Sequence, residues 1–157
     1  MHSTVYELAD HPIAKSSYMT PGYLPDWFFD TIADYATEMS GAERADSIAT
    51  LAEYFGSLCT RSGDQISFSP QLKQTYFKES HRYFKEAAKA LSKIDYDSFA
   101  GITPATAFHL ALKRITESYT DSFYIYEGGE LSPLDNWLRS ADISKPFYIG
   151  GTINYHY

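Results

Sequence analysis

Residues 26–39, DWFFDTIADYATEM, decide the fold prediction for this chain. The apolar residues of this stretch recur at the three- and four-residue spacing of a helix with one buried face: they are Phe28, Ile32, Tyr35, Ala36 and Met39. Pro25 precedes the stretch, and proline is tolerated at a helix start because its missing N–H would have no partner there. The sequence therefore predicts a helix over residues 26–39.

Four further helices are predicted from similar patterns, over about 42–60, 70–93, 103–119 and 132–139. Ser40 and Glu43 have the spacing of a capping box, in which each side chain bonds the backbone N–H of the other residue. Ser69-Pro70 is typical of a helix start. Shorter runs predict strands over residues 4–8, 65–68 and 122–127. The tail, residues 146–157, is predicted as a strand or as a hairpin around Gly150-Gly151.

These elements predict a helix-dominated α+β fold. We expect about five helices and a small antiparallel sheet formed from the N-terminal, 122–127 and C-terminal segments. No repeat or linker divides the sequence, so residues 1–157 are predicted to form a single domain. A single cysteine, Cys59, excludes an internal disulfide framework. There is no apolar run of membrane-spanning length and no signal-like start, so we expect a cytoplasmic protein that does not insert into a membrane.

Acidic and basic residues are concentrated in different segments of the chain. Residues 26–53 contain seven acidic residues and one basic residue, a net charge of −6. Four of these acids fall at successive intervals of four, on the side of the predicted 26–39 helix opposite its apolar arc: Asp26, Asp30, Asp34 and Glu38, here called the acidic ridge. Like charges at this spacing destabilise a helix by a few tenths of a kcal/mol per pair. The regular row therefore favours a function, although a solvated face is the simpler alternative.

The leading hypothesis is a small acidic, non-catalytic protein that modulates or inhibits a partner protein with a basic groove. A row of carboxylates resembles the phosphates of a nucleic-acid strand, so the acidic ridge could act as a nucleic-acid mimic. In composition alone, the chain is similar to small acidic inhibitors from phages and mobile elements. No metal is predicted at the acidic ridge, because a single helix cannot surround a cation with its carboxylates.

Residues 70–93 have the opposite charge, with six basic and two acidic residues and a net charge of +4. One narrow stripe of the predicted helix carries most of the bases: Lys78, Arg82, Lys85, Lys89 and Lys93, here called the basic ridge. The alternative hypothesis is that this stripe binds nucleic acid or a phosphorylated ligand. Direct nucleic-acid binding is less favoured because the protein is acidic overall. A solvated face, or pairing with the acidic ridge within one molecule or across a homodimer, is also open.

Catalytic motifs are absent from the sequence. The five histidines are scattered and form no zinc-binding pair. The Gly-Gly pairs lack the flanking residues of a phosphate-binding loop. We therefore predict no catalytic residue, no metal and no cofactor, and an enzyme with an unrecognised site is the least favoured alternative.

Overall fold

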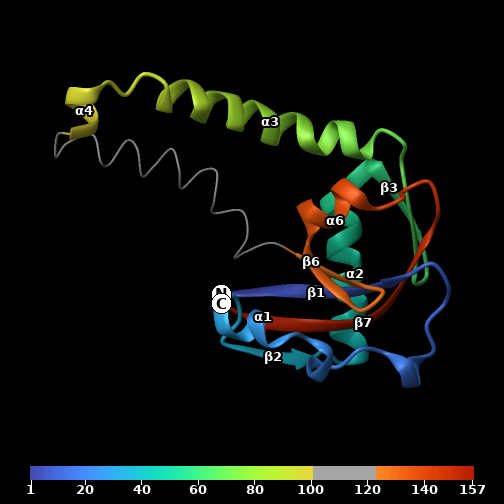
Figure 1. Ribbon diagram of the computed structural model, residues 1–157. Helices are drawn as coiled ribbons and strands as arrows, with labels where there is room; N and C mark the ends of the chain where they lie inside the picture. The colour runs from blue at the N-terminus through green and yellow to red at the C-terminus, as the bar shows by residue number, and fades with distance from the viewer. Residues whose placement is uncertain (101–122) are drawn as a thin grey trace. The chain divides into compact units, whose positions relative to one another are not determined.

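The computed structural model describes residues 1–100 and 123–157 (Figure 1). The chain divides into two compact units: Met1–Leu72 with Thr120–Tyr157 is unit 1, and Lys73–Tyr119 is unit 2. The organisation of residues 1–157 as one domain stays a prediction. The helix predicted over 103–119 lies outside the described residues.

One sheet dominates unit 1. Seven strands within the described residues form it: β1 His2–Ala9, β2 Tyr35–Glu38, β3 Cys59–Ser62, β4 Gln65–Phe68, β5 Tyr124–Glu127, β6 Glu130–Pro133 and β7 Phe147–His156. Their order is β3-β4-β7-β1-β5-β6, and β2 also pairs with β7. The β1–β5 pair is parallel, while the other pairs are antiparallel.

The predicted fold class, a helix-dominated fold with a small antiparallel sheet, is therefore wrong. The three segments assigned to that sheet do join it, as β1, β5 and β7. The sheet is larger and mixed, because four further strands pair with these three or with one another and because β5 runs parallel to β1.

The tail forms the continuous strand β7, without a hairpin at Gly150-Gly151. Its register with β1 changes at this point: Tyr6 lies opposite Thr152, whereas Leu8 lies opposite Ile149. Two glycines of β7 thus face the single residue Glu7 of β1, which is the geometry of a β-bulge. The extra residue reverses which side chains of β7 point to each face of the sheet.

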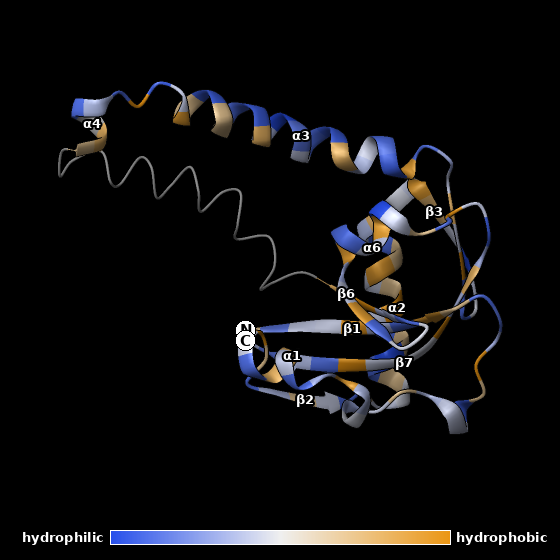
Figure 2. Cartoon of the chain, in the orientation of Figure 1, coloured by the Kyte–Doolittle hydropathy of each residue, from blue (hydrophilic) through white to orange (hydrophobic). Residues whose placement is uncertain are grey.

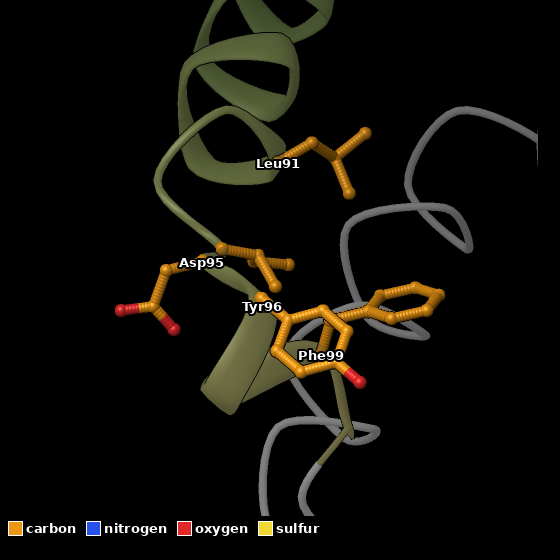
Figure 3. Close-up of a pocket in the computed structure, with 5 residues that line it drawn as sticks. Leu91, Asp95, Tyr96 and Phe99 are labelled. Atoms are coloured by element: carbon orange, nitrogen blue, oxygen red, sulfur yellow. The ribbon is translucent and has the colours of Figure 1, made fainter.

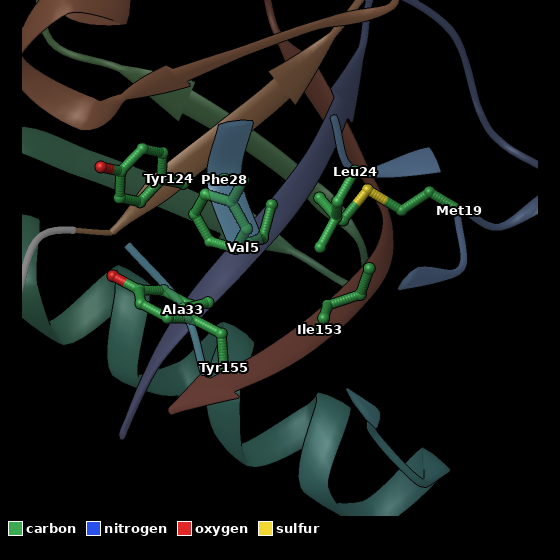
Figure 4. Close-up of a cluster of buried hydrophobic side chains, with 8 residues drawn as sticks. All are labelled: Val5, Met19, Leu24, Phe28, Ala33, Tyr124, Ile153 and Tyr155. Atoms are coloured by element: carbon green, nitrogen blue, oxygen red, sulfur yellow. The ribbon is translucent and has the colours of Figure 1, made fainter. Parts of the chain in front are cut away.

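Helices cover both faces of the sheet in unit 1. On one face, α2 (Gly41–Phe55) and α6 (Leu134–Ser140) meet at Phe68, which contacts Phe55 and Trp137 with ring centroids 5.1 and 6.0 Å apart. On the other face, α1 (Asp26–Thr31) covers an apolar cluster (Figure 4): Val5, Met19, Leu24, Phe28, Ala33, Tyr124, Ile153 and Tyr155. Short 3₁₀ turns connect the elements at Lys15–Ser17 (η1), Pro21–Tyr23 (η2) and Gly56–Leu58 (η3).

The prediction of one helix over residues 26–39 is also wrong. Only Asp26–Thr31 is helical, and Tyr35–Glu38 is the strand β2, which pairs with β7. Phe28 anchors the short helix, since it is fully buried and its ring contacts Tyr124 and Tyr155 edge-to-face. Pairing with β7 overrides the helical spacing of the remaining apolar residues, as tertiary contacts commonly do.

Several local predictions are confirmed. Ser40 and Glu43 form the capping box at the start of α2, and the hydrogen bonds to Ser40 lower the pKa of the Glu43 carboxyl. Residues 65–68 form β4 as predicted. The predicted helix over 42–60 ends earlier, because Gly56 adopts a positive φ of 53° and the chain then enters β3.

Unit 2 contains α3 (Leu72–Leu91), whose first residue belongs to unit 1, and α4 (Tyr96–Ala100). Figure 2 shows hydrophilic residues along most of α3, with apolar ones at intervals. The long helix predicted over 70–93 is thus confirmed, with its start two residues later than expected. Within the part of the chain that the structure describes, no helix has the length and apolar character needed to span a bilayer.

Candidate functional site

The acidic ridge is not the face of one helix. Asp26 and Asp30 belong to α1, Asp34 lies in the turn after it, and Glu38 ends β2. All four residues are exposed, and they remain together on one helix–turn–strand segment. The residues are therefore available at the surface of unit 1, but without the even spacing that the sequence predicts. Their role in partner binding is not tested by this placement and stays a prediction.

Basic side chains do not neutralise this segment. Over residues 1–100 and 123–157, no lysine or arginine forms an ion pair with Asp26, Asp30 or Glu38. Asp34 has one partner, since its carboxylate lies 3.1 Å from Nδ1 of His156. The ring of His156 in turn stacks on Tyr35, with centroids 5.1 Å apart and planes 3° apart. Of the four carboxylates, that of Asp34 thus lies beside this aromatic pair.

Charge follows the division into units. Unit 1 contains 15 acidic and 5 basic residues, a net charge of −10, whereas unit 2 contains 5 acidic and 8 basic residues, a net charge of +3. Together these give the net charge of −7 for the whole chain. Large fields of one sign steer partners of the opposite sign. The two units therefore carry net charges of opposite sign.

The basic ridge lies where the sequence predicts it. Lys78, Arg82, Lys85 and Lys89 are exposed on α3, and Lys93 is exposed just beyond its end. Arg82 forms an ion pair with Glu79 at 2.9 Å, and its guanidinium lies 5.0 Å from the centre of the Tyr83 ring. Tyr83 and Phe84 are themselves 50% and 55% exposed. The helix thus combines cations with accessible aromatic rings.

A pocket of about 340 Å³ lies where α3 is followed by α4 (Figure 3). Its lining is mainly apolar and aromatic: Leu91, Ile94, Asp95, Tyr96 and Phe99. Figure 3 shows the Asp95 carboxylate turned away from Leu91 and the rings. Among the described residues that line the pocket, none is basic.

A polar cluster at the β7 bulge is missed by the sequence analysis. The Glu7 carboxylate accepts hydrogen bonds from the backbone N–H groups of Gly151 (2.6 Å) and Met19 (2.9 Å). Arg44 donates to the carbonyl oxygens of Gly150 and Ile149, both at 2.7 Å, and to Asp64 at 2.9 Å. Glu7 and Arg44 both bond backbone groups, so the cluster is structural. The sequence offers no local signal for this cluster, because Glu7 and Gly151 lie 144 residues apart.

The single cysteine, Cys59, is not activated as a nucleophile. Burial raises the pKa of the Cys59 thiol, whose Sγ lies 3.4 Å from the carbonyl oxygen of Ala52. A thiol with a raised pKa is a poor nucleophile at neutral pH. Over the described residues, no three His, Cys, Asp or Glu side chains are grouped so that they could hold a metal ion.

Comparisons with known proteins add no family. No family model matches the chain, and neither a curated protein nor a solved structure gives a significant match.

Proposed function

We propose that the protein binds a macromolecular partner with a basic surface, and modulates or inhibits it, through the exposed carboxylates of the α1–β2 segment. The observation that carries the proposal is the excess of ten negative charges in unit 1. Asp26, Asp30 and Glu38 contribute to it without a lysine or arginine partner in the described residues. The cytoplasm is the proposed place of this interaction, because the free Cys59 fits a reducing compartment.

Mimicry of a phosphate row is outside this proposal. That hypothesis depends on four carboxylates at equal steps along one helix, and α1 ends at Thr31. Charge complementarity with a basic groove does not need equal steps, because electrostatic attraction acts over distances of about 8–10 Å at ordinary ionic strength.

Reversal of three charges is expected to abolish binding with little loss of stability. Asp30→Lys, Asp34→Lys and Glu38→Lys together change the net charge from −7 to −1. We expect affinity for a lysine-rich probe peptide to fall at least tenfold, measured by fluorescence anisotropy in 50 mM salt. Exposed substitutions usually change the free energy of unfolding by less than about 0.5 kcal/mol each, so the melting temperature should remain close to that of the native protein.

A matched control separates this segment from bulk charge. Asp46→Lys, Glu53→Lys and Glu130→Lys alter three other exposed acids of unit 1 and give the same net charge. The control variant should lose less than threefold in affinity. Equal losses in the two variants would contradict a site on the α1–β2 segment.

A second candidate function is the binding of single-stranded nucleic acid by the basic ridge. The favouring observation is that α3 exposes Tyr83 and Phe84 among its cations. Proteins that bind single strands combine a cationic track for the phosphates with aromatic rings on which bases stack.

The salt dependence of binding tests this second candidate. Four phosphate contacts on a single strand predict that log K falls with log salt with a slope of about −3. Lys85→Ala with Lys89→Ala should make that slope shallower by about 1.4, whereas Lys15→Ala with Lys145→Ala, in unit 1, should leave it unchanged. Titration of a labelled 20-nucleotide strand between 50 and 300 mM salt measures both. Absence of binding at 50 mM salt rejects this function.

A further inference from the structure

β2 has one open edge. It pairs with β7 alone: Tyr35, Ala36, Thr37 and Glu38 lie opposite His156, Tyr155, Asn154 and Ile153. In Figure 1, β2 lies on the side of β7 away from β1. A strand with one unpaired edge presents N–H and C=O groups that can pair with another chain.

The hydrogen bonds identify which groups face outward. The Met39 N–H donates to the Thr152 carbonyl oxygen at 3.3 Å, in line with the β2–β7 register. Alternate residues of an antiparallel strand direct both backbone groups to the same neighbour. Thr37 therefore faces β7, while Ala36 and Glu38 direct their N–H and C=O groups to the outer side.

The opposite edge of β7 gives the same alternation. The Tyr157 N–H donates to the Met1 carbonyl oxygen at 3.0 Å, so residues 153, 155 and 157 bond toward β1. Residues 152, 154 and 156 then bond toward β2, which again leaves Ala36 and Glu38 pointing outward.

Nothing in the described residues pairs with these outward groups. The turn η2 lies near β2, but its own backbone bonds close within the turn, from Tyr23 to Thr20 and from Leu24 to Pro21. No backbone hydrogen bond from Ala36 or Glu38 to an element other than β7 occurs in residues 1–100 and 123–157.

The charge beside this edge selects the occupant. Glu38 is the last residue of β2, Asp34 directly precedes the strand and Asp30 lies in α1 four residues earlier, and all three are exposed. A second copy of this chain, paired antiparallel on the same edge, would bring the carboxylates of the two copies close together, and facing like charges destabilise strand pairs. A strand with lysine or arginine side chains would instead gain charge-assisted contacts.

We propose that the open edge of β2 captures an extended, lysine- or arginine-bearing segment of a protein partner by strand addition. This inference rests on the proposed function and specifies its mode of binding. Backbone bonds to Ala36 and Glu38 supply the pairing, and the three carboxylates select the side chains.

Amide hydrogen exchange tests the pairing directly. The probe is a peptide of alternating lysine and threonine, seven residues long, and its control is the same peptide with N-methylated backbone amides. On addition of the probe, exchange at the Ala36 and Glu38 amides should slow at least tenfold, while the Thr37 amide, already bonded to β7, should not change. The N-methylated peptide should bind at least tenfold more weakly.

Two proline variants test the edge from the protein side. Ala36→Pro removes an outward N–H that β7 does not use, a placement that edge strands tolerate. It should weaken peptide binding at least tenfold while every charge is retained. If this variant fails to fold, Glu38→Pro compared with Glu38→Gln measures the same loss at equal charge, and the N-methylated peptide requires no variant.

The outcomes separate this inference from the proposed function. Equal binding of both peptides, with loss of affinity only in the charge-reversed triple variant, overturns strand addition and leaves the proposed function standing. Absence of binding by either peptide at 50 mM salt overturns both. Protection of Ala36 and Glu38 that rises with protein concentration alone identifies a second copy as the occupant and overturns the inference.

Discussion

Phe28→Ala is expected to lower the free energy of unfolding by about 3–5 kcal/mol, the usual cost of deleting a fully buried aromatic ring. The Phe28 ring is 0% exposed and packs edge-to-face on Tyr124 and Tyr155, with centroids 5.1 Å away in both cases. For a protein of this size the loss corresponds to a fall in melting temperature of about 10 °C. Denaturant titration followed by circular dichroism measures the change.

Phe29→Ala is the matched control. This neighbour on α1 is 38% exposed, so its removal should cost less than about 1 kcal/mol. Similar losses for the two variants would contradict the placement of α1 on the sheet. Because Phe28 also fixes α1, its loss should release Asp26 and Asp30 from their present arrangement.

Arg44→Met is expected to cost about 2–4 kcal/mol, because it removes charge-assisted hydrogen bonds that no other group replaces. The Arg44 side chain is 16% exposed and donates to the carbonyl oxygens of Ile149 and Gly150. These carbonyls lie in the section of β7 between its pairing with β4 and its pairing with β2. The variant leaves both without a donor, and thermal unfolding measures the loss.

Arg61→Met is the control for Arg44, since the Arg61 side chain is exposed and donates to the Gly63 carbonyl oxygen at 2.8 Å. Its replacement should change stability by less than about 0.5 kcal/mol. A cost for Arg44→Met no larger than this would show that solvent satisfies the β7 carbonyls as well as the guanidinium does.

The sequence predicts those elements whose determinants are local. Ser40 and Glu43 act on each other three residues apart, so the start of α2 is correct. The alternation of residues 65–68 is enough to predict β4, and the helical spacing of apolar residues over 70–93 is enough to predict α3. For the same reason the basic ridge lies on one exposed helix, as predicted.

The misassigned elements depend on contacts distant in sequence. Tyr35 and Ala36 fit the apolar spacing of a helix, and only their pairing with His156 and Tyr155 makes them a strand. At Gly150-Gly151 the pattern of a hairpin turn is equally local. There the absence of a side chain serves close approach, since a Cβ at Gly151 would lie 2.8 Å from the Met19 carbonyl oxygen.

The candidate site was predictable in part. Exposure and sign of charge could be predicted for the acidic ridge, because unpaired carboxylates rarely enter a core. Its geometry could not be predicted, since that depends on where α1 ends. The open edge of β2 could not be predicted either, because an edge strand can be identified only from the strand order of the sheet.

The position of β7 affects how the chain folds during its synthesis. β7 is the last strand in sequence, yet β1, β2 and β4 all pair with it. During synthesis these three strands emerge from the ribosome long before residues 147–156, and closure of such distant pairs is slow. In nascent unit 1 these three strands therefore stay without their partner until residues 147–156 have been made, and unpaired strand edges are prone to aggregation.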